Sequence, residues 1–131
     1  SSDVCSSDLA EKWFKNAIEI QVKDDQNLDY AKTLNALANI YADQGQIGQA
    51  ETYYKIALDI REKKLGKNHP DYARILNNLA GVYQFTGEYD KAISTYERLA
   101  RIDDQNPEVY YGIGQVSYQY TKEYEKSLQN T

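Results

Sequence analysis

Basic residues and asparagines recur at matching places in this sequence. Lys32 and Asn35 are followed 42 residues later by Arg74 and Asn77. An asparagine amide carries both a donor and an acceptor, so it can bond the N–H and C=O groups of an extended peptide without regard to its side chains. A basic side chain one helical turn earlier can pair with an acidic side chain or a C-terminal carboxylate. This spacing suits recognition of a peptide backbone, although the same amides can instead bond neighbouring helices.

Catalytic and metal-binding patterns are not found in the sequence. His69 is the only histidine, and its place in LGKNHP predicts a residue that closes a loop between repeats. No glycine-rich phosphate loop precedes a helix, and no Cys/His spacing suits zinc. The acid pairs Asp24-Asp25 and Asp103-Asp104 are expected to solvate turns. We therefore expect no enzyme, no cofactor and no metal site.

The composition excludes several classes of protein. Hydrophobic residues make up 41% and charged residues 27%, and no apolar run approaches the ~20 residues that span a bilayer. The net charge is −5, with acids and bases interspersed, which argues against a nucleic-acid footprint. The one basic cluster, Lys63, Lys64 and Lys67, falls where a helix should end and interacts favourably with its dipole. We expect neither nucleic-acid nor membrane partners, and a cytoplasmic location.

The elements that position the asparagines form an internal repeat. YAKTLNALANIYADQGQIGQAETYYKIALDI, from Tyr30, matches YARILNNLAGVYQFTGEYDKAISTYERLARI, from Tyr72, at a constant offset of 42. AEKWFKNAIEI, from Ala10, mirrors AETYYKIALDI, from Ala50. A shorter copy, VYYGIGQVSYQYTKEYEKSL, follows Pro107 and has Gly114 at its expected small-residue position.

The apolar spacing in each unit predicts a pair of helices. Leu34, Leu37, Ala38 and Tyr41 fall at helical spacing, as do their counterparts 42 residues later. A turn glycine follows, at Gly45 and at Gly87, and small residues in the second helix allow close approach. Such a pair cannot bury both of its faces, so it must stack on neighbouring units.

These motifs resemble tetratricopeptide repeats. The Leu-x-x-Leu-Ala-x-x-Tyr helix, the turn glycine, the Ala-x-x-x-Tyr-x-x-Ala helix and Pro107 carry the resemblance, and the 42-residue form with LNxLAxxY and HP is similar to the repeats of kinesin light chains. The resemblance implies an all-α, right-handed superhelical solenoid of antiparallel helix pairs. We expect about three units and seven helices, divided into a half repeat over 10–26, repeats over 28–69 and 70–106, and a partial repeat over 107–131.

The resemblance also implies that the first helices line a concave groove for a partner peptide. Nine residues are predicted to face that groove, and Tyr118 to extend its wall: Lys32, Asn35, Asn39, Arg74, Asn77, Asn78, Gln84, Tyr111 and Gln115. The expected function is therefore protein–protein interaction. The alternative is a regulatory or self-associating scaffold arm within a larger signalling protein. An alternative for the asparagines stays open: their amides can bond neighbouring helices inside the solenoid and so fix its curvature, instead of contacting a peptide.

The first nine residues, SSDVCSSDL, differ from the rest of the sequence. They resemble a translated sequencing adaptor, so we expect residues 1–9, with the single cysteine Cys5, to be a non-native leader before a domain over 10–131. The alternative is a natural segment that caps a helix from Ala10. We expect a piece truncated at both ends, whose uncapped apolar residues, Trp13 among them, favour self-association.

Overall fold

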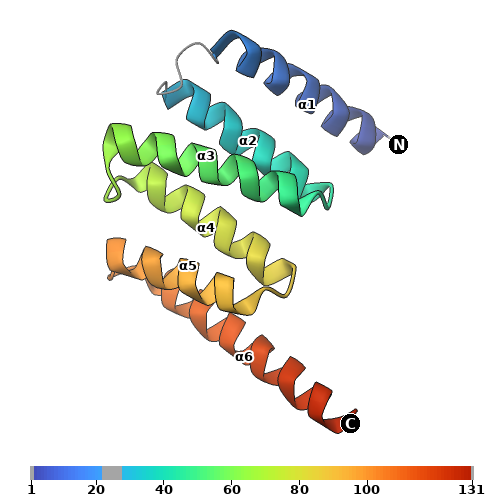
Figure 1. Ribbon diagram of the computed structural model, residues 1–131, viewed down its shortest axis with the longest axis vertical. Helices are drawn as coiled ribbons and strands as arrows, with labels where there is room; N and C mark the ends of the chain where they lie inside the picture. The colour runs from blue at the N-terminus through green and yellow to red at the C-terminus, as the bar shows by residue number, and fades with distance from the viewer. Residues whose placement is uncertain (1, 22–27, 131) are drawn as a thin grey trace. The chain divides into compact units, whose positions relative to one another are not determined.

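The computed structural model describes residues 2–21 and 28–130, where all of the regular structure is helical. The helices follow one another along the chain as α1 (Ser2–Gln21), α2 (Leu28–Asp43), α3 (Ile47–Leu65), α4 (Pro70–Phe85), α5 (Tyr89–Ile102) and α6 (Pro107–Gln129) (Figure 1). The chain divides into two compact units, residues 1–75 (unit 1) and 76–131 (unit 2), so α4 begins in unit 1 and ends in unit 2.

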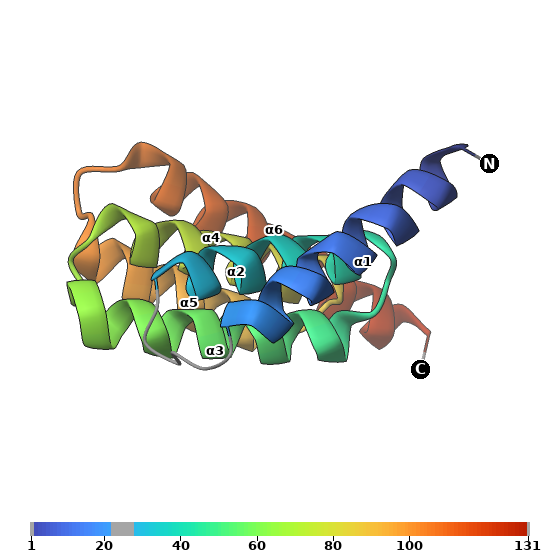
Figure 2. The same cartoon turned by 90° about the horizontal axis from the view of Figure 1, so that it is seen from above.

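Unit 1 is built on the packing of α2 between α1 and α3. Helices α2 and α3 lie side by side in both views (Figure 1 and Figure 2). The ring of Tyr41 stacks on that of Tyr53, with centroids 5.5 Å apart and planes inclined by 12°. The predicted apolar face of α2 is buried, together with apolar residues of α3 and the start of α4. The core of unit 1 contains Ala31, Leu34, Leu37, Ala38, Tyr41, Ala50, Tyr54, Ala57, Leu58, Ile60, Tyr72 and Ile75.

In unit 2, α5 packs against α6. Its core contains Leu76, Leu79, Ala80, Val82, Tyr83, Ala92, Tyr96, Leu99, Val109 and Val116. The small residue that permits close packing of α6 is Gly112, because a Cβ there would come within 2.9 Å of the Tyr96 ring. The expectation that Gly114 holds this place is wrong, since nothing lies within 4 Å of a Cβ built on Gly114.

Glycines reverse the chain between paired helices, as predicted. Gly45 and Gly87 both have φ of +80°, a conformation that glycine adopts without steric cost. After Gly45, the N–H of Gln46 donates to the carbonyl of Tyr41 at 2.8 Å, and the N–H of Gly45 to that of Ala42 at 3.0 Å. This hydrogen-bond pattern is the Schellman motif, which satisfies carbonyls at the helix end and redirects the chain.

Polar side chains hold α1 on α2. Tyr41 donates its hydroxyl to Glu11 Oε1 at 3.2 Å, and Lys15 Nζ lies 2.8 Å from the same oxygen. The hydrogen bond with Lys15 lowers the pKa of Glu11, and the same bond raises the pKa of Lys15. Burial raises the pKa of Tyr41, so its hydroxyl stays protonated and available to donate.

The last repeat differs from expectation in having a single helix. Seven helices were predicted, but α6 runs without a break from Pro107 to Gln129, so the described residues form six. The reason lies in the turn position: no glycine follows Gly114 in the sequence, and a left-handed turn is costly for other residues. At the other end, α1 begins at Ser2, well before the expected helix start at Ala10.

Candidate functional site

A polar hollow of about 260 Å³ lies in unit 1 between the starts of α2 and α4 and the end of α3. It is lined by Asp29, Lys32, Asn35, Arg61, Asp71, Arg74 and Ile75. Three of the predicted groove residues, Lys32, Asn35 and Arg74, therefore line one site. Three basic side chains face two carboxylates there, so the hollow carries an excess of positive charge.

Asp71 organises the charges of the hollow. Its carboxylate accepts a hydrogen bond from Arg61 Nη1 at 2.9 Å through Oδ2, while Arg74 Nη1 lies 3.7 Å from Oδ1. The position of Asp71 in the first turn of α4 also places its negative charge at the positive end of that helix. One carboxylate thus links a buried arginine to an exposed one.

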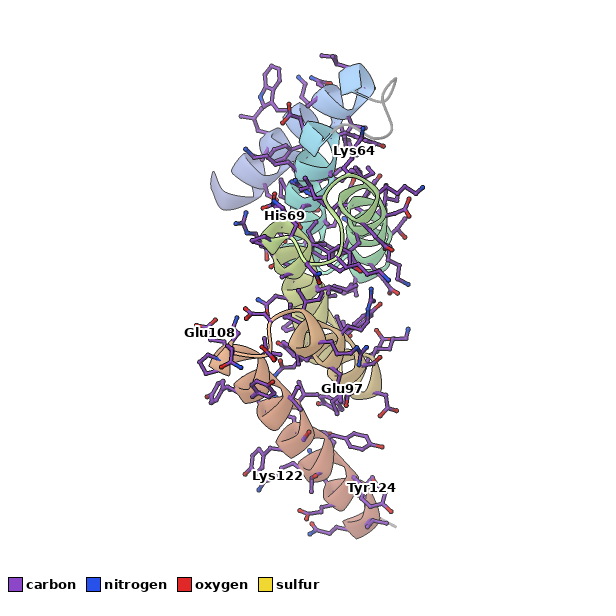
Figure 3. All side chains as sticks on the ribbon, turned by 90° about the vertical axis from the view of Figure 1, so that its left-hand side faces the viewer. Lys64, His69, Glu97, Glu108, Lys122 and Tyr124 are labelled. Atoms are coloured by element: carbon purple, nitrogen blue, oxygen red, sulfur yellow. The ribbon has the colours of Figure 1, made fainter. Side chains whose placement is uncertain are left out.

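His69 fixes the start of α4. Its Nδ1 accepts a hydrogen bond from the backbone N–H of Asp71 at 3.1 Å, and it directly precedes Pro70, the first residue of the helix. Figure 3 shows His69 in the segment that leads into α4. This arrangement caps the helix, because Nδ1 satisfies an N–H that has no partner inside it. His69, which was expected to close the loop between repeats, therefore also caps the start of α4.

Arg61 lines the hollow but is not among the residues predicted from the sequence. It is only 9% exposed, and its Nε atom is buried without a hydrogen-bond partner among the described residues. The recurrence at 42 residues could not identify it, since Asp103 stands at the corresponding place in the next unit. The signal that could identify it is its position about one turn before the end of α3 at Leu65, where the chain turns into α4.

The remaining predicted residue of unit 1 has a structural role. The amide oxygen of Asn39, on α2, accepts the hydroxyl of Tyr54, on α3. Burial, and secondarily the charge of Asp43, raises the pKa of Tyr54 to about 12, which keeps the phenol neutral and able to donate. A buried phenol needs such a partner, so Asn39 joins the two helices of its own repeat.

In unit 2 the predicted residues lie on α4 and α6. Asn77 is exposed and Asn78 is half-buried. Gln84 Nε2 donates to Gln119 Oε1 at 2.9 Å and so links α4 to α6. On the exposed side of α6, Gln115 Nε2 donates to the hydroxyl of Tyr111 at 3.1 Å, one turn away; Tyr118 on the same helix is also exposed.

Groups of histidine, cysteine and acidic side chains suited to holding a metal ion do not occur among the described residues. In the same part of the chain, no helix is long and apolar enough to cross a membrane.

Comparison with known proteins gives a family and a fold. The model of the tetratricopeptide repeat family matches residues 5–63 and 29–105. BtubC (BKLC) from P. vanneervenii has a TM-score of 0.82 at 23% identity, over 95% of this chain and 53% of that one. A Podosopora anserina protein of the kinesin light chain type, with nearly identical TPR-like repeats, has a TM-score of 0.75 at 19% identity, over 97% of this chain and 64% of that one.

A variant of the Podosopora anserina protein gives the same TM-score, 0.75, at 18% identity. This chain thus spans between about half and two thirds of the solved chains that it matches. A search of curated proteins gave no match. The likeness confirms the predicted all-α fold of about three TPR-like repeats.

Proposed function

Because this chain belongs to the tetratricopeptide repeat family, we propose that it is a protein-binding module that holds an extended segment of a partner against its first helices. Proteins of this family are typically scaffolds for protein–protein interaction without enzymatic activity. The observation that carries the proposal is the hollow of unit 1, where Lys32, Asn35 and Arg74 line one site.

The size and charge of the hollow indicate what it holds. Its volume of about 260 Å³ is below that of pockets for drug-sized ligands, about 300–1,000 Å³, and suits one side chain of a longer segment. The excess of basic side chains favours an acidic residue. The ion pair with Asp71 limits the directions in which Arg74 can reach that residue, while the Arg74 side chain remains 70% exposed and accessible.

Asn35 would allow the site to bind partner segments of different sequence. Its amide can bond the backbone of an extended segment, so the partner needs only an acidic side chain at the hollow. Asn77 is proposed to make the same backbone contact in unit 2. Affinity for one short peptide should be roughly micromolar, since ordering a flexible ligand offsets much of the contact energy.

A peptide array tests the proposal. The whole chain is applied to immobilised random peptides and to matched sets in which each acidic residue is replaced by its amide. We expect binding to peptides that carry an acidic residue, and a roughly fivefold loss with Arg74→Ala. Arg101→Ala, which removes an exposed arginine from the last turn of α5, should bind like the wild type.

Two results would contradict the proposal. The first is an array with no bound peptide at protein concentrations well above micromolar. The second is equal binding by the wild type, by Arg74→Ala and by Lys32→Ala, which would place the contact elsewhere.

A further inference from the structure

His69 lies against Asp71, one of the two carboxylates that line the hollow of unit 1. Its Nδ1 accepts the backbone N–H of Asp71 at 3.1 Å, and the same Nδ1 lies 3.8 Å from Asp71 Oδ2. The His69 side chain is 40% exposed, so it exchanges protons with the solvent. Histidine is the side chain whose charge ordinarily changes within the range of about pH 5 to pH 8. The contacts of His69 with Asp71 therefore depend on pH.

Neutral and protonated His69 make different contacts with Asp71. The neutral ring has a lone pair on Nδ1 and accepts the backbone N–H, as it does in this structure. The protonated ring carries a hydrogen on both nitrogens and cannot accept. Its Nδ1–H can instead pair with the Asp71 carboxylate, since 3.8 Å separates Nδ1 from Oδ2. Protonation thus exchanges a helix cap for an ion pair.

Asp71 is also the carboxylate that restrains Arg74. Arg74 Nη1 lies 3.7 Å from Asp71 Oδ1, whereas Arg61 Nη1 lies 2.9 Å from Oδ2. A third cation beside the carboxylate weakens its attraction for the other two. The contact of Arg74 is the longer one, and its side chain is 70% exposed, so Arg74 is the group that is released. Protonation of His69 therefore frees a basic side chain that lines the hollow.

The net charge around His69 changes in the same direction. Among the described residues, three basic and two acidic side chains line the hollow, so its net charge rises from +1 to +2 when His69 is protonated beside it. In the loop before His69, Lys67 is already paired with Glu62 at 3.5 Å. The charged side chains considered are Asp29 and Lys32 on α2, Arg61 and Glu62 on α3, Lys67 in the loop, and Asp71 and Arg74 on α4.

The start of α4 does not depend on the imidazole alone. The backbone N–H groups of Tyr72 and Ala73 both donate to the carbonyl of His69, at 3.0 and 3.3 Å. These bonds are unaffected by the charge of the ring. Loss of the cap thus removes one hydrogen bond of several at this helix end, and Asp71 and Arg74 keep their places on the first turns of α4.

We propose that His69 is a pH switch for the hollow, whose protonation strengthens the binding of an acidic partner residue. The inference rests on the function proposed above, because it concerns the same site and the same ligand. One more positive charge within about 8 Å of a bound carboxylate, the Debye length at physiological salt, should tighten binding by about threefold under largely aqueous screening.

Fluorescence anisotropy of a labelled, acid-containing peptide selected from the array tests the inference. The dissociation constant of the whole chain is measured from about pH 8 to about pH 5.5, a range in which peptide carboxylates stay ionised. We expect the wild type to bind about threefold more tightly at the acidic end. His69→Asn is the matched control, since asparagine caps helices well but does not titrate. Its dissociation constant should stay near the high-pH value of the wild type.

NMR of the imidazole gives a second readout. His69 is the only histidine, so its ring signals report on its charge without overlap. Coupling between two binding events is reciprocal. Saturation with the peptide should therefore move the midpoint of the His69 titration to higher pH, an effect that a purely structural cap would not produce.

The outcomes separate the inference from the function on which it rests. Equal pH dependence in the wild type and in His69→Asn overturns the inference and leaves the proposed function standing, because the peptide still binds. Weaker binding by the wild type at the acidic end also overturns it, since loss of the cap then outweighs the added charge. Absence of binding at every pH overturns both.

Discussion

Replacing Asp71 by alanine removes the counter-charge of a buried arginine. Arg61 is 9% exposed, and its Nη1 lies 2.9 Å from Asp71 Oδ2. Breaking a fully buried ion pair from one side costs about 3–5 kcal/mol, because the remaining charge has no compensation. The Asp71 side chain is 28% exposed, so water partly screens the pair. We therefore expect Asp71→Ala to lower the free energy of unfolding by about 2 kcal/mol.

Urea unfolding followed by circular dichroism at 25 °C measures this loss. Asp90→Ala is the matched control: Asp90 occupies the second position of α5 as Asp71 does of α4, so it loses the helix-dipole contribution without a buried arginine. Arg61→Met should lower the free energy of unfolding less than Asp71→Ala does, because it removes the buried charge itself. The double variant should be no less stable than Arg61→Met. Equal losses for Asp71→Ala and Asp90→Ala would refute the reasoning.

Three further predictions concern the turns and the titrating side chains. Gly87→Ala should destabilise by about 1–2 kcal/mol, because φ is +80° there, whereas Gly114→Ala, in open space within α6, should stabilise by about 0.5–1 kcal/mol; thermal melts compare the two. Tyr54 has a pKa raised to about 12, so its contribution is present below its ordinary pKa of about 10 and is lost as the pH rises towards 12; Tyr54→Phe should flatten the fall in urea midpoint over that interval. The pKa of Glu11 is lowered by its hydrogen bond with Lys15, so its contribution is present above about pH 4.3 and is lost as the pH falls through the lower folded value; Glu11→Gln should weaken the loss of stability between pH 5 and pH 3, and an unchanged profile would contradict this.

Much of the fold could be predicted because its causes are local. The helical spacing of Leu34, Leu37 and Tyr41 identifies a buried face without knowledge of its partner. Gly45 and Gly87 predict the reversals, because few other residues adopt the required φ. The last repeat was mispredicted because its resemblance to earlier units suggested a turn, although no residue there favours positive φ.

The candidate site could be predicted only in part, because its geometry depends on contacts between helices. Lys32, Asn35 and Arg74 were found from their recurrence and do line one hollow. Arg61 does not recur in the next unit, and its ion pair with Asp71 depends on how α4 follows α3. Asn39 is of a residue type expected to line the groove. Its amide oxygen instead accepts a hydrogen bond from the Tyr54 hydroxyl, a contact that depends on how α3 lies against α2.

Binding at the hollow of unit 1 is the central claim, and an NMR titration tests it most directly. Isotope-labelled protein is titrated with an acid-containing peptide selected from the array, and the side-chain amide signal of Asn35 and the guanidinium signal of Arg74 are followed. We predict that both shift with the same micromolar dissociation constant, and that the amidated peptide leaves them unmoved. Saturable binding of the acidic peptide with both signals unmoved would contradict the account.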